Sequence, residues 1–551
     1  MEPHVRATAA TELNAGGKTW LGHPPGLFLL FLVEMWERFS YYGMRGFLVL
    51  YLTTPETGMR LEMRPAGAAE GFNPGRGWDD GTASVLYGWY TGLVYLTPLI
   101  GGLIADRWIG THRSMVTGGI IIALGHVLLA ISGLGDLAHN TAGLSLFIGG
   151  LAMVVIGTGH FKPTVSVMVG QLYSPDDPRR DGAFTIFYMG INLGAFLCGF
   201  VCGTLAEKVG WHWGFGSAAL GMLAGLTLYL LLRPRYLATV GLPPGDKGGR
   251  APWFILTAFA LSAVVAVAFH QGGLAWLNTA LMRQMGRVPV IVLLAAAVLA
   301  LVAWFLKLQR PEDRGPVATI FVFTFFNAFF WVAFEQAGSS INLFTDRHTD
   351  RFIGTFQVPT TWFQSINAGL IFILAPAFAV LWTALERRRR NPGQAVKIAL
   401  GLLMLGIGFM FMAWAGFITR DGAPKAGMSL VVLTYFWHTV GELCLSPTGL
   451  AYVTKTAPMR FLSLLMGVWF ISSFMANLAG GLIAAQVDKI AEGKIKLPWH
   501  FGGQADFYVL FVVTSIGAAL LIFMLSPLLN RLGAPAGPPK NPPSGPSPPN
   551  A

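Results

Sequence analysis

Long apolar stretches separated by short polar connections run through most of the chain. A helix needs about 20 mostly apolar residues to cross a bilayer, and stretches of about that length recur between residues 27 and 530. We predict fourteen membrane-spanning helices, at residues 27–52, 84–106, 114–133, 143–169, 183–206, 213–232, 252–271, 288–308, 317–341, 361–385, 396–417, 427–452, 461–485 and 505–530. The pattern therefore predicts an all-α polytopic membrane protein.

The connections divide these fourteen helices into two sets of six with two further helices between them. A Gly-, Pro- and Lys-rich stretch at 233–250 reads as a central linker, and the two helices after it carry almost no charge in their apolar cores. We interpret 252–271 and 288–308 as two extra helices between two six-helix bundles, because weak symmetry between halves is common in such membrane proteins. The predicted parts are a cytoplasmic N-terminal segment (1–26), an N-terminal six-helix bundle (27–232), a linker with two additional helices (233–316), a C-terminal six-helix bundle (317–530) and a disordered cytoplasmic tail (531–551).

Composition supports a membrane location and excludes several other classes. The 551 residues are 54% hydrophobic and 12% charged, against about 25% charged in a soluble protein. The net charge of +11 indicates loops that face anionic lipid rather than a nucleic-acid partner. Basic residues are more frequent in the connections on the side of the N-terminus, which predicts cytoplasmic termini in a cell (inner) membrane. The first 26 residues contain no signal-peptide core.

The three cysteines and the known catalytic motifs give no sign of a metal site or an enzyme. Cys198, Cys202 and Cys444 lie inside apolar segments and lack both metal-ligand spacing and a disulfide pattern. A phosphate-binding Gly-rich loop, a zinc-protease motif and a nucleophile elbow are also missing from the sequence. We expect neither metal nor cofactor, and no catalytic residue.

The first predicted helix carries three charges close together. Glu34, Glu37 and Arg38 lie within an otherwise apolar run, where each charge costs roughly 2.5 to 3.5 kcal/mol on insertion scales. With Tyr41 they follow an i, i+3, i+4, i+7 spacing and share one helical face. That face is expected to line a polar cavity and to find partners there.

Lys162 is the partner that depth favours. At 1.5 Å per residue, Glu34 lies about 10 Å and Arg38 about 16 Å from the inner start of the first helix. The fourth helix runs the other way, which puts Lys162 about 10 Å from the same surface. We therefore predict that Lys162 pairs with the face that carries Glu34 and Glu37.

Other polar residues inside apolar helices have two readings. Asn192 is either a ligand-binding amide or an interhelical hydrogen-bonding group. Glu335 is either a proton-coupling carboxyl or a helix-end acid, whereas Glu442, near the middle of its helix, is predicted to be functional. Asn367 and Gln364 share a helical face, and His160 is expected to pack.

The loop after the second helix resembles the loop motif of the major facilitator superfamily. Its glycines permit a tight turn and close helix approach, and its arginines suit the cytoplasmic side. The residues of this conformational loop are Gly102, Asp106, Arg107, Gly110 and Arg113.

Taken together and in order, these motifs are specific. They are Glu34-x-x-Glu37-Arg38-Phe39-x-Tyr41-Tyr42-Gly43, the facilitator loop, Gly157-Thr158-Gly159-x-x-Lys162-Pro163, Phe187-Tyr188-x-x-Ile191-Asn192-x-Gly194, Glu335-Gln336 and Gly441-Glu442-x-x-x-Ser446-Pro447. The chain resembles the proton-dependent oligopeptide transporter family, within the major facilitator superfamily, over about residues 27–530. The resemblance implies fourteen helices, as in bacterial members, and no enzymatic activity.

The resemblance also implies roles for single residues. Proton coupling would involve Glu34, Glu37, Arg38, Lys162 and Glu335. Arg38 and Lys162 would face a peptide carboxylate, and Glu442 the peptide amino group. The rest of the substrate site would comprise Tyr41, Tyr42, Tyr95, Asn192, Trp331, Asn367, Trp469 and Ser473.

The implied function is proton-coupled import of di- and tripeptides by alternating access. The expected partners are the peptides, protons and the lipid bilayer, with a monomeric protein and a proton gradient in place of a cofactor. Two alternatives stay open: a member of the same family that carries nitrate or another organic ion, and a proton-coupled drug exporter that shares only the superfamily fold.

Overall fold

The computed structural model describes residues 19–60, 64–65, 67–174, 176–242, 251–273 and 288–533. A helix lies at each of the fourteen predicted spans. Within the described residues, eleven helical stretches are long and apolar enough to cross a membrane. The first helix is not among them, because it carries Glu34, Glu37, Arg38 and Arg45.

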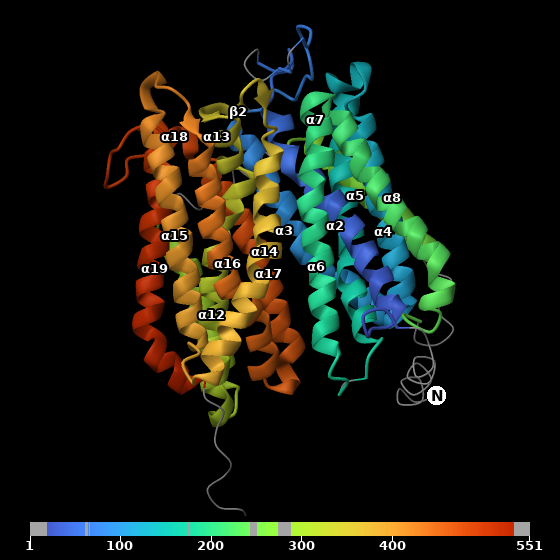
Figure 1. The fold of residues 1–551 in the computed structure, drawn as a ribbon, viewed down its shortest axis with the longest axis vertical. Coiled ribbons are helices and arrows are strands. Elements are labelled where there is room, and N and C mark those ends of the chain that lie inside the picture. Colours follow the sequence, from blue (N-terminus) through green and yellow to red (C-terminus); the bar gives the residue numbers. More distant parts are fainter. Residues whose placement is uncertain are drawn as a thin grey trace, which may run out of the picture.

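The first half of the chain forms one group of helices, coloured blue to green in Figure 1. Its elements are α2 (Pro25–Thr53), α3 (Asp80–Ile104), the π-helical turn Ala105–Ile109, α4 (Gly110–Ile131), α5 (Thr141–Gly170), α6 (Arg180–Cys198), the π-helical turn Gly199–Gly203, α7 (Thr204–Lys208) and α8 (Trp211–Tyr236). Capping fixes several starts: α2 begins on a proline, and the Asp79 and Asn140 side chains accept from Thr82 N and Gly143 N at the starts of α3 and α5. We call this group the N-half.

The second half forms a separate group, coloured yellow-green to red in Figure 1. Its elements are α12 (Pro311–Phe334), the 3-10 turn Glu335–Gly338, α13 (Ser340–His348), α14 (Thr361–Arg387), α15 (Gln394–Ile418), α16 (Met428–Thr456), α17 (Leu462–Ala484), α18 (Val487–Ala491) and α19 (Ala505–Leu532). Four two-residue strands lie in its connections: β1 (Thr349–Asp350) pairs with β4 (Ala426–Gly427), and β2 (Phe352–Ile353) with β3 (Phe356–Gln357). We call this group the C-half.

The two extra helices lie against different halves. From α9 (Ala251–His270), Ala258 packs with Ile121 and Met153 of the N-half. From α11 (Val288–Lys307), Phe305 packs edge-on against Phe321 and Phe461 of the C-half. The exact domain boundaries given above stay a prediction. Parts of the predicted domains lie outside the described residues, namely 1–18, 243–250, 274–287 and 534–551.

Both described chain ends lie at the same end of the helices. α2 begins and α19 finishes at the lower end in Figure 1, which we call the inner end, and α7, α13 and α18 lie at the opposite, outer end. Polar links between the halves gather toward the outer end. Arg347 of α13, for example, binds Asp80 of α3 through two hydrogen bonds of 2.5 and 2.8 Å.

Close helix packing depends on glycine where α3 crosses α5. A Cβ atom added to Gly101 would lie 2.0 Å from the backbone oxygen of Gly159, which cannot rotate away. We predict that Gly101→Ala destabilises the protein by about 1–3 kcal/mol, the usual cost of overpacking. Thermal unfolding in detergent measures the change. Gly517→Ala in α19, where a Cβ atom meets nothing within 4 Å, is the control that should leave the midpoint unchanged; equal midpoints for both variants would contradict the packing argument.

Candidate functional site

The charged face of α2 is buried and paired. Arg38 Nε lies 3.0 Å from Glu34 Oε1 and 2.5 Å from Glu37 Oε2, and all three side chains are nearly inaccessible. The i, i+4 spacing of Glu34 and Arg38 thus brings them into direct contact. Among the described residues, Arg38 Nη2 and Glu34 Oε2 find no hydrogen-bond partner. The cluster can therefore still donate one hydrogen bond and accept another.

Lys162 lies on an aromatic ring rather than between the carboxylates. Its ammonium is 3.8 Å from the centre of the Tyr95 ring, and the described part of the chain gives no ion pair from Lys162 to Glu34 or Glu37. The predicted pairing of Lys162 with the face of Glu34 and Glu37 is therefore not made as an ion pair in this conformation, in which Arg38 is the cation that contacts both carboxylates. Lys162 still acts electrostatically on both of them.

A second buried ion pair joins the two halves. Arg45 of α2 binds Glu335, the first residue of the 3-10 turn that ends α12. Arg45 Nε also donates to the Tyr87 hydroxyl at 2.5 Å, and its guanidinium lies 5.7 Å from the centre of the Tyr42 ring. The Glu335 carboxylate is thus buried and forms an ion pair between the two halves; it is not an exposed acid at a helix end.

Glu442 and Asn367 form a polar pair inside the C-half. Asn367 Nδ2 of α14 donates to Glu442 Oε2 of α16 at 2.9 Å and is 3.0 Å from Thr439 Oγ1. Glu442 is only 7% exposed. One carboxylate oxygen is thus held by an amide, and no cation of the described residues lies within ion-pair distance.

A cavity of about 240 Å³ lies between the halves, beside the Arg45–Glu335 pair and the Asn367–Glu442 pair. Aromatic side chains form much of its lining. Two carboxylates of the C-half also face it, Glu335 from the 3-10 turn after α12 and Glu442 from α16. Its lining includes Tyr42, Arg45, Tyr95, Tyr188 and Asn192 from the N-half, and Trp331, Phe334, Glu335, Asn367, Tyr435 and Glu442 from the C-half. Such a mixture of aromatic walls and a few placed charges is typical of small-molecule sites.

The outer side of the cavity is closed by hydrogen bonds to one backbone oxygen. Gln364 Nε2 of α14 and Asn342 Nδ2 of α13 each donate to Gly46 O of α2 at 2.9 Å. Both donors come from the C-half and the acceptor from the N-half. Together with Arg45 and Glu335 they hold the halves together on this side.

Comparison with known proteins identifies the family. The model of the POT family matches residues 112–499. The chain belongs to the POT family. It is 38% identical over 527 residues to a peptide transporter of Yersinia enterocolitica subsp. palearctica, covering 93% of this chain and 96% of that protein. It is 32% identical over 534 residues to a di-/tripeptide transporter of Lactococcus lactis subsp. cremoris, covering 95% and 99%.

A solved structure shares the fold over nearly the whole length. The peptide transporter POT in complex with sulfate is 32% identical, with a TM-score of 0.74 and coverage of 97% of this chain and 99% of that one. The resemblance drawn from the motifs is confirmed, as is the fold class of an all-α polytopic membrane protein with two six-helix bundles and two additional helices.

Not every residue predicted for the POT substrate site reaches the cavity. Tyr41 is buried inside the N-half, stacked on Tyr90 with 6.2 Å between ring centres. Trp469 packs against a small apolar cluster of the C-half, and Ser473 Oγ donates to Trp469 O at 3.3 Å. None of these three side chains lines the cavity in this conformation: Tyr41 and Trp469 pack against apolar neighbours, and Ser473 bonds back to its own helix. Their part in the substrate site stays a prediction.

Arg38 and Lys162 lie behind the lining rather than in it. Arg38 is held by its two carboxylates, and the Tyr95 ring contacts the Lys162 ammonium while itself lining the cavity. Tyr42, Tyr95, Asn192, Trp331, Asn367 and Glu442 do line it, as predicted. Their individual roles in this POT protein stay predictions.

Sequence reasoning missed Arg45 and Tyr188. Arg45 continues the face of α2 that carries Arg38, seven residues further on, so the spacing alone could have indicated it. Tyr188 precedes Asn192 by one turn, and Asn192 Nδ2 donates to Tyr188 O at 3.0 Å. Both line the cavity.

The conformational loop has the local geometry its glycines predict. The chain passes through the π-helical turn Ala105–Ile109, and Gly110 starts α4 with φ of +77°. Asp106 and Arg107 are exposed, Arg113 is half-buried, and Gly102 lies 3.6 Å, measured from an added Cβ atom, from Pro163. His160 is buried beside Ser114 and packs against Phe254, as expected. A conformational role of the loop remains a prediction.

Proposed function

We propose that this protein is a proton-coupled symporter that imports di- and tripeptides by alternating access. The observation that carries the proposal is the cavity between the halves, with a carboxylate at Glu442 on one wall and the cations Arg38 and Lys162 behind the opposite wall. A peptide zwitterion needs both an anionic and a cationic partner within one site. The peptide-transporting relatives support the same substrate class.

The peptide amino group is proposed to bind Glu442. The carboxylate is buried and already oriented by Asn367, so an ammonium group can pair with it without paying for its ordering. The aromatic lining then receives variable side chains through apolar contact. A cavity of about 240 Å³ is slightly smaller than the usual ligand site of about 300–1,000 Å³, which favours short peptides.

The peptide carboxylate is proposed to face Arg38 and Lys162. Reaching them requires the Tyr95 ring to shift and Arg38 to loosen its hold on Glu34 and Glu37. A proton on either carboxylate weakens that hold because it removes the negative charge that Arg38 binds. Proton entry and peptide binding are thus coupled through one set of side chains, and the two carboxylates titrate as a unit.

Proton movement supplies the driving force. A membrane potential adds about 2.3 kcal/mol per elementary charge for each 100 mV, which suffices for uphill uptake. We also propose a cell (inner) membrane location with cytoplasmic termini and a monomer as the working unit. The inner-end arginines Arg387 to Arg390 support this orientation by the positive-inside rule.

Uptake by proteoliposomes tests the function. With an acidic exterior, we expect accumulation of labelled dialanine above its external concentration, and its loss when a protonophore collapses the gradient. Unlabelled tripeptides should compete, whereas nitrate should not. Competition by nitrate alone would favour the anion alternative, and gradient-driven efflux of lipophilic cations without dialanine uptake would favour a drug exporter.

A further inference from the structure

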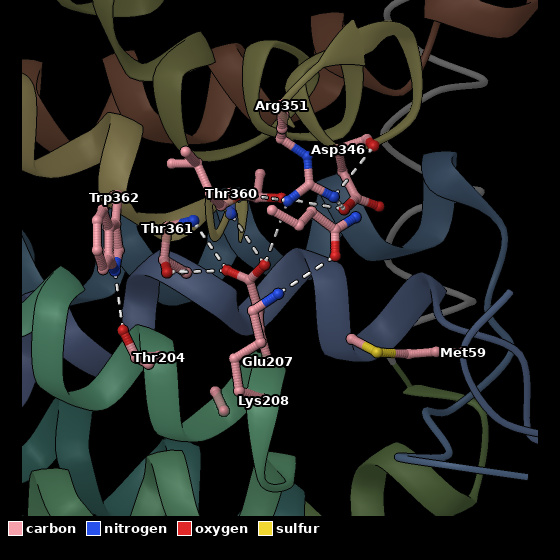
Figure 2. A network of polar contacts seen from close by, with 12 residues as sticks. Met59, Thr204, Glu207, Lys208, Asp346, Arg351, Thr360, Thr361 and Trp362 are labelled. Carbon is pink, nitrogen blue, oxygen red and sulfur yellow. Dashed lines mark hydrogen bonds and ion pairs between the residues drawn. The ribbon is translucent and has the colours of Figure 1, made fainter. Parts of the chain in front are cut away.

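Glu207 is a buried carboxylate of the N-half whose described partners all belong to the C-half. It lies on α7 at the outer end and is 6% exposed. Its Oε2 accepts from Thr360 N at 2.9 Å, and its Oε1 accepts from Thr361 N and Thr361 Oγ1 at 2.9 Å each (Figure 2). The two acceptor atoms therefore bind the N-cap residue and the first residue of α14 across the boundary between the halves.

A guanidinium completes the group from the C-half side. Arg351 Nη1 lies 3.7 Å from Glu207 Oε2 and donates to Val358 O at 2.7 Å, while Arg351 Nη2 lies 3.1 Å from Asp346 Oδ1. Without Glu207, Arg351 would still be paired with Asp346, as Figure 2 shows. Arg351 therefore does not need Glu207 as its counter-ion. The contacts of Glu207 mainly stabilise the association of the two halves. We call Glu207, Asp346, Arg351, Thr360 and Thr361 the outer latch.

Glycines of the N-half let α14 approach closely beside the latch. A Cβ atom on Gly203 would lie 2.0 Å from Thr361 Oγ1, and one on Gly199 would lie 2.3 Å from Ser365 Oγ. Trp362 Nε1 also donates to Thr204 Oγ1 at 2.8 Å. Along this seam α6–α7 and α14 are therefore in direct contact.

The seam leads directly to the cavity. Thr361 binds Glu207 and also lines the cavity, as do Gly199 and Ser365. A peptide entering between α6 and α14 from the outer side would have to pass through the latch. Opening must separate Glu207 from both threonines at once, because they occupy its two oxygens.

We propose that Glu207 is a positioning residue that holds α14 against α6 and α7 and thereby sets how often the cavity opens to the outer face. The proposal rests on alternating access, as proposed above. In the opened state water replaces Thr360 and Thr361 around the carboxylate, so the latch biases an equilibrium instead of locking one state. Hydrogen bonds to a charged group correspond to a population shift on the order of 10- to 100-fold.

Cys198 provides a native reporter of opening, because it lines the cavity and is 5% exposed. In full-length protein with Cys202 and Cys444 replaced by alanine, it is the only cysteine. We expect Glu207→Gln to speed labelling of Cys198 by a membrane-impermeant maleimide, added to right-side-out vesicles, on the order of tenfold. Glu207→Asp keeps the charge on a shorter side chain, so its labelling rate should lie between those of the wild-type protein and Glu207→Gln.

Arg76→Gln is the matched control. Arg76 is also buried at the outer end, but it donates to the Tyr51 hydroxyl at 2.6 Å, Ala138 O at 2.8 Å and Ser132 O at 2.9 Å, all within the N-half. Its loss should lower the melting temperature without changing the labelling rate. An unchanged labelling rate in folded Glu207→Gln and Glu207→Asp would overturn the proposal, as would equal acceleration in Arg76→Gln.

Transport kinetics give a second readout that a purely structural role would not produce. If Glu207→Gln raises the outward-open fraction, the apparent KM for external dialanine falls because binding-competent protein is more abundant. The kcat falls as well, because closure over the peptide is weaker. A rise in KM would contradict the latch. Labelling needs no substrate, so it judges the latch even if dialanine proves not to be transported.

Discussion

Glutamine in place of Glu335 is expected to abolish accumulation of dialanine driven by a pH gradient, while exchange of labelled for unlabelled dialanine across the same membrane continues. Glu335 and Arg45 form a buried ion pair from opposite halves, directly beside the cavity. A proton on Glu335 would weaken that pair and let the halves part. Glutamine resembles the protonated acid permanently, so the cycle loses its proton-dependent step but keeps peptide binding.

The fold of this variant is expected to survive with reduced stability. Breaking a buried pair costs about 3–5 kcal/mol when the remaining charge is left alone, but the Tyr87 hydroxyl and the glutamine oxygen still contact Arg45. Glu386→Gln is the charge-matched control, since Glu386 contacts Asn391 at the inner end of α14 away from the cavity. Gradient-driven accumulation at the wild-type level in Glu335→Gln would remove Glu335 from the coupling step.

The sequence was most informative where a residue violates the membrane pattern. Glu34, Glu37 and Arg38 are costly in an apolar helix, so their shared face and their need for polar partners could be predicted from the sequence, and so could the burial of Glu442. Helix positions followed from the length of each apolar stretch, because in a bilayer the backbone must satisfy its own hydrogen bonds. These rules are local and need no knowledge of which helices are neighbours.

Sequence reasoning could not place a side chain whose direction depends on the neighbouring helix. Tyr41 shares the charged face of α2 but turns to Tyr90, and the lysine predicted to pair with Glu34 lies on the ring of Tyr95. Depth along the membrane placed Lys162 at the right height and could not choose between a carboxylate and a ring at that height.

Glu207 shows a further limit of sequence reasoning. It lies near a helix end beside Lys208, which is an ordinary place for an exposed acid. Only the approach of α14, made possible by Gly199 and Gly203, buries it against Thr360 and Thr361. Such a residue is recognisable once the two halves are placed together.

Glutamine in place of Glu442 is expected to raise the KM for dialanine roughly 100-fold, which corresponds to about 3 kcal/mol for a buried charged partner of the peptide ammonium. The amide keeps the size of the side chain and a hydrogen bond with Asn367, so the change removes charge and little else. The informative measurement compares dialanine with N-propionyl-alanine, which lacks the amino group. Wild-type protein should prefer dialanine strongly, and Glu442→Gln should transport or bind the two almost equally.

Thr439→Val separates loss of the charge from disturbance of its surroundings. It removes the 3.0 Å contact between Thr439 Oγ1 and Asn367 Nδ2 but leaves the carboxylate in place. We expect it to retain the preference for dialanine, with a KM change below about tenfold, because the two hydrogen bonds lost, to Asn367 Nδ2 and to Tyr435 O, are both neutral and neither involves the carboxylate. If Glu442→Gln still prefers dialanine as strongly as the wild-type protein does, the amino group binds elsewhere. In that case an anion and a cation on opposite sides of the cavity do not explain the selection of peptides. If the preference disappears in Glu442→Gln and persists in Thr439→Val, the negative charge itself is the recognition element, and the cluster of Glu34, Glu37 and Arg38 on the other side is left to respond to the carboxyl end and the proton.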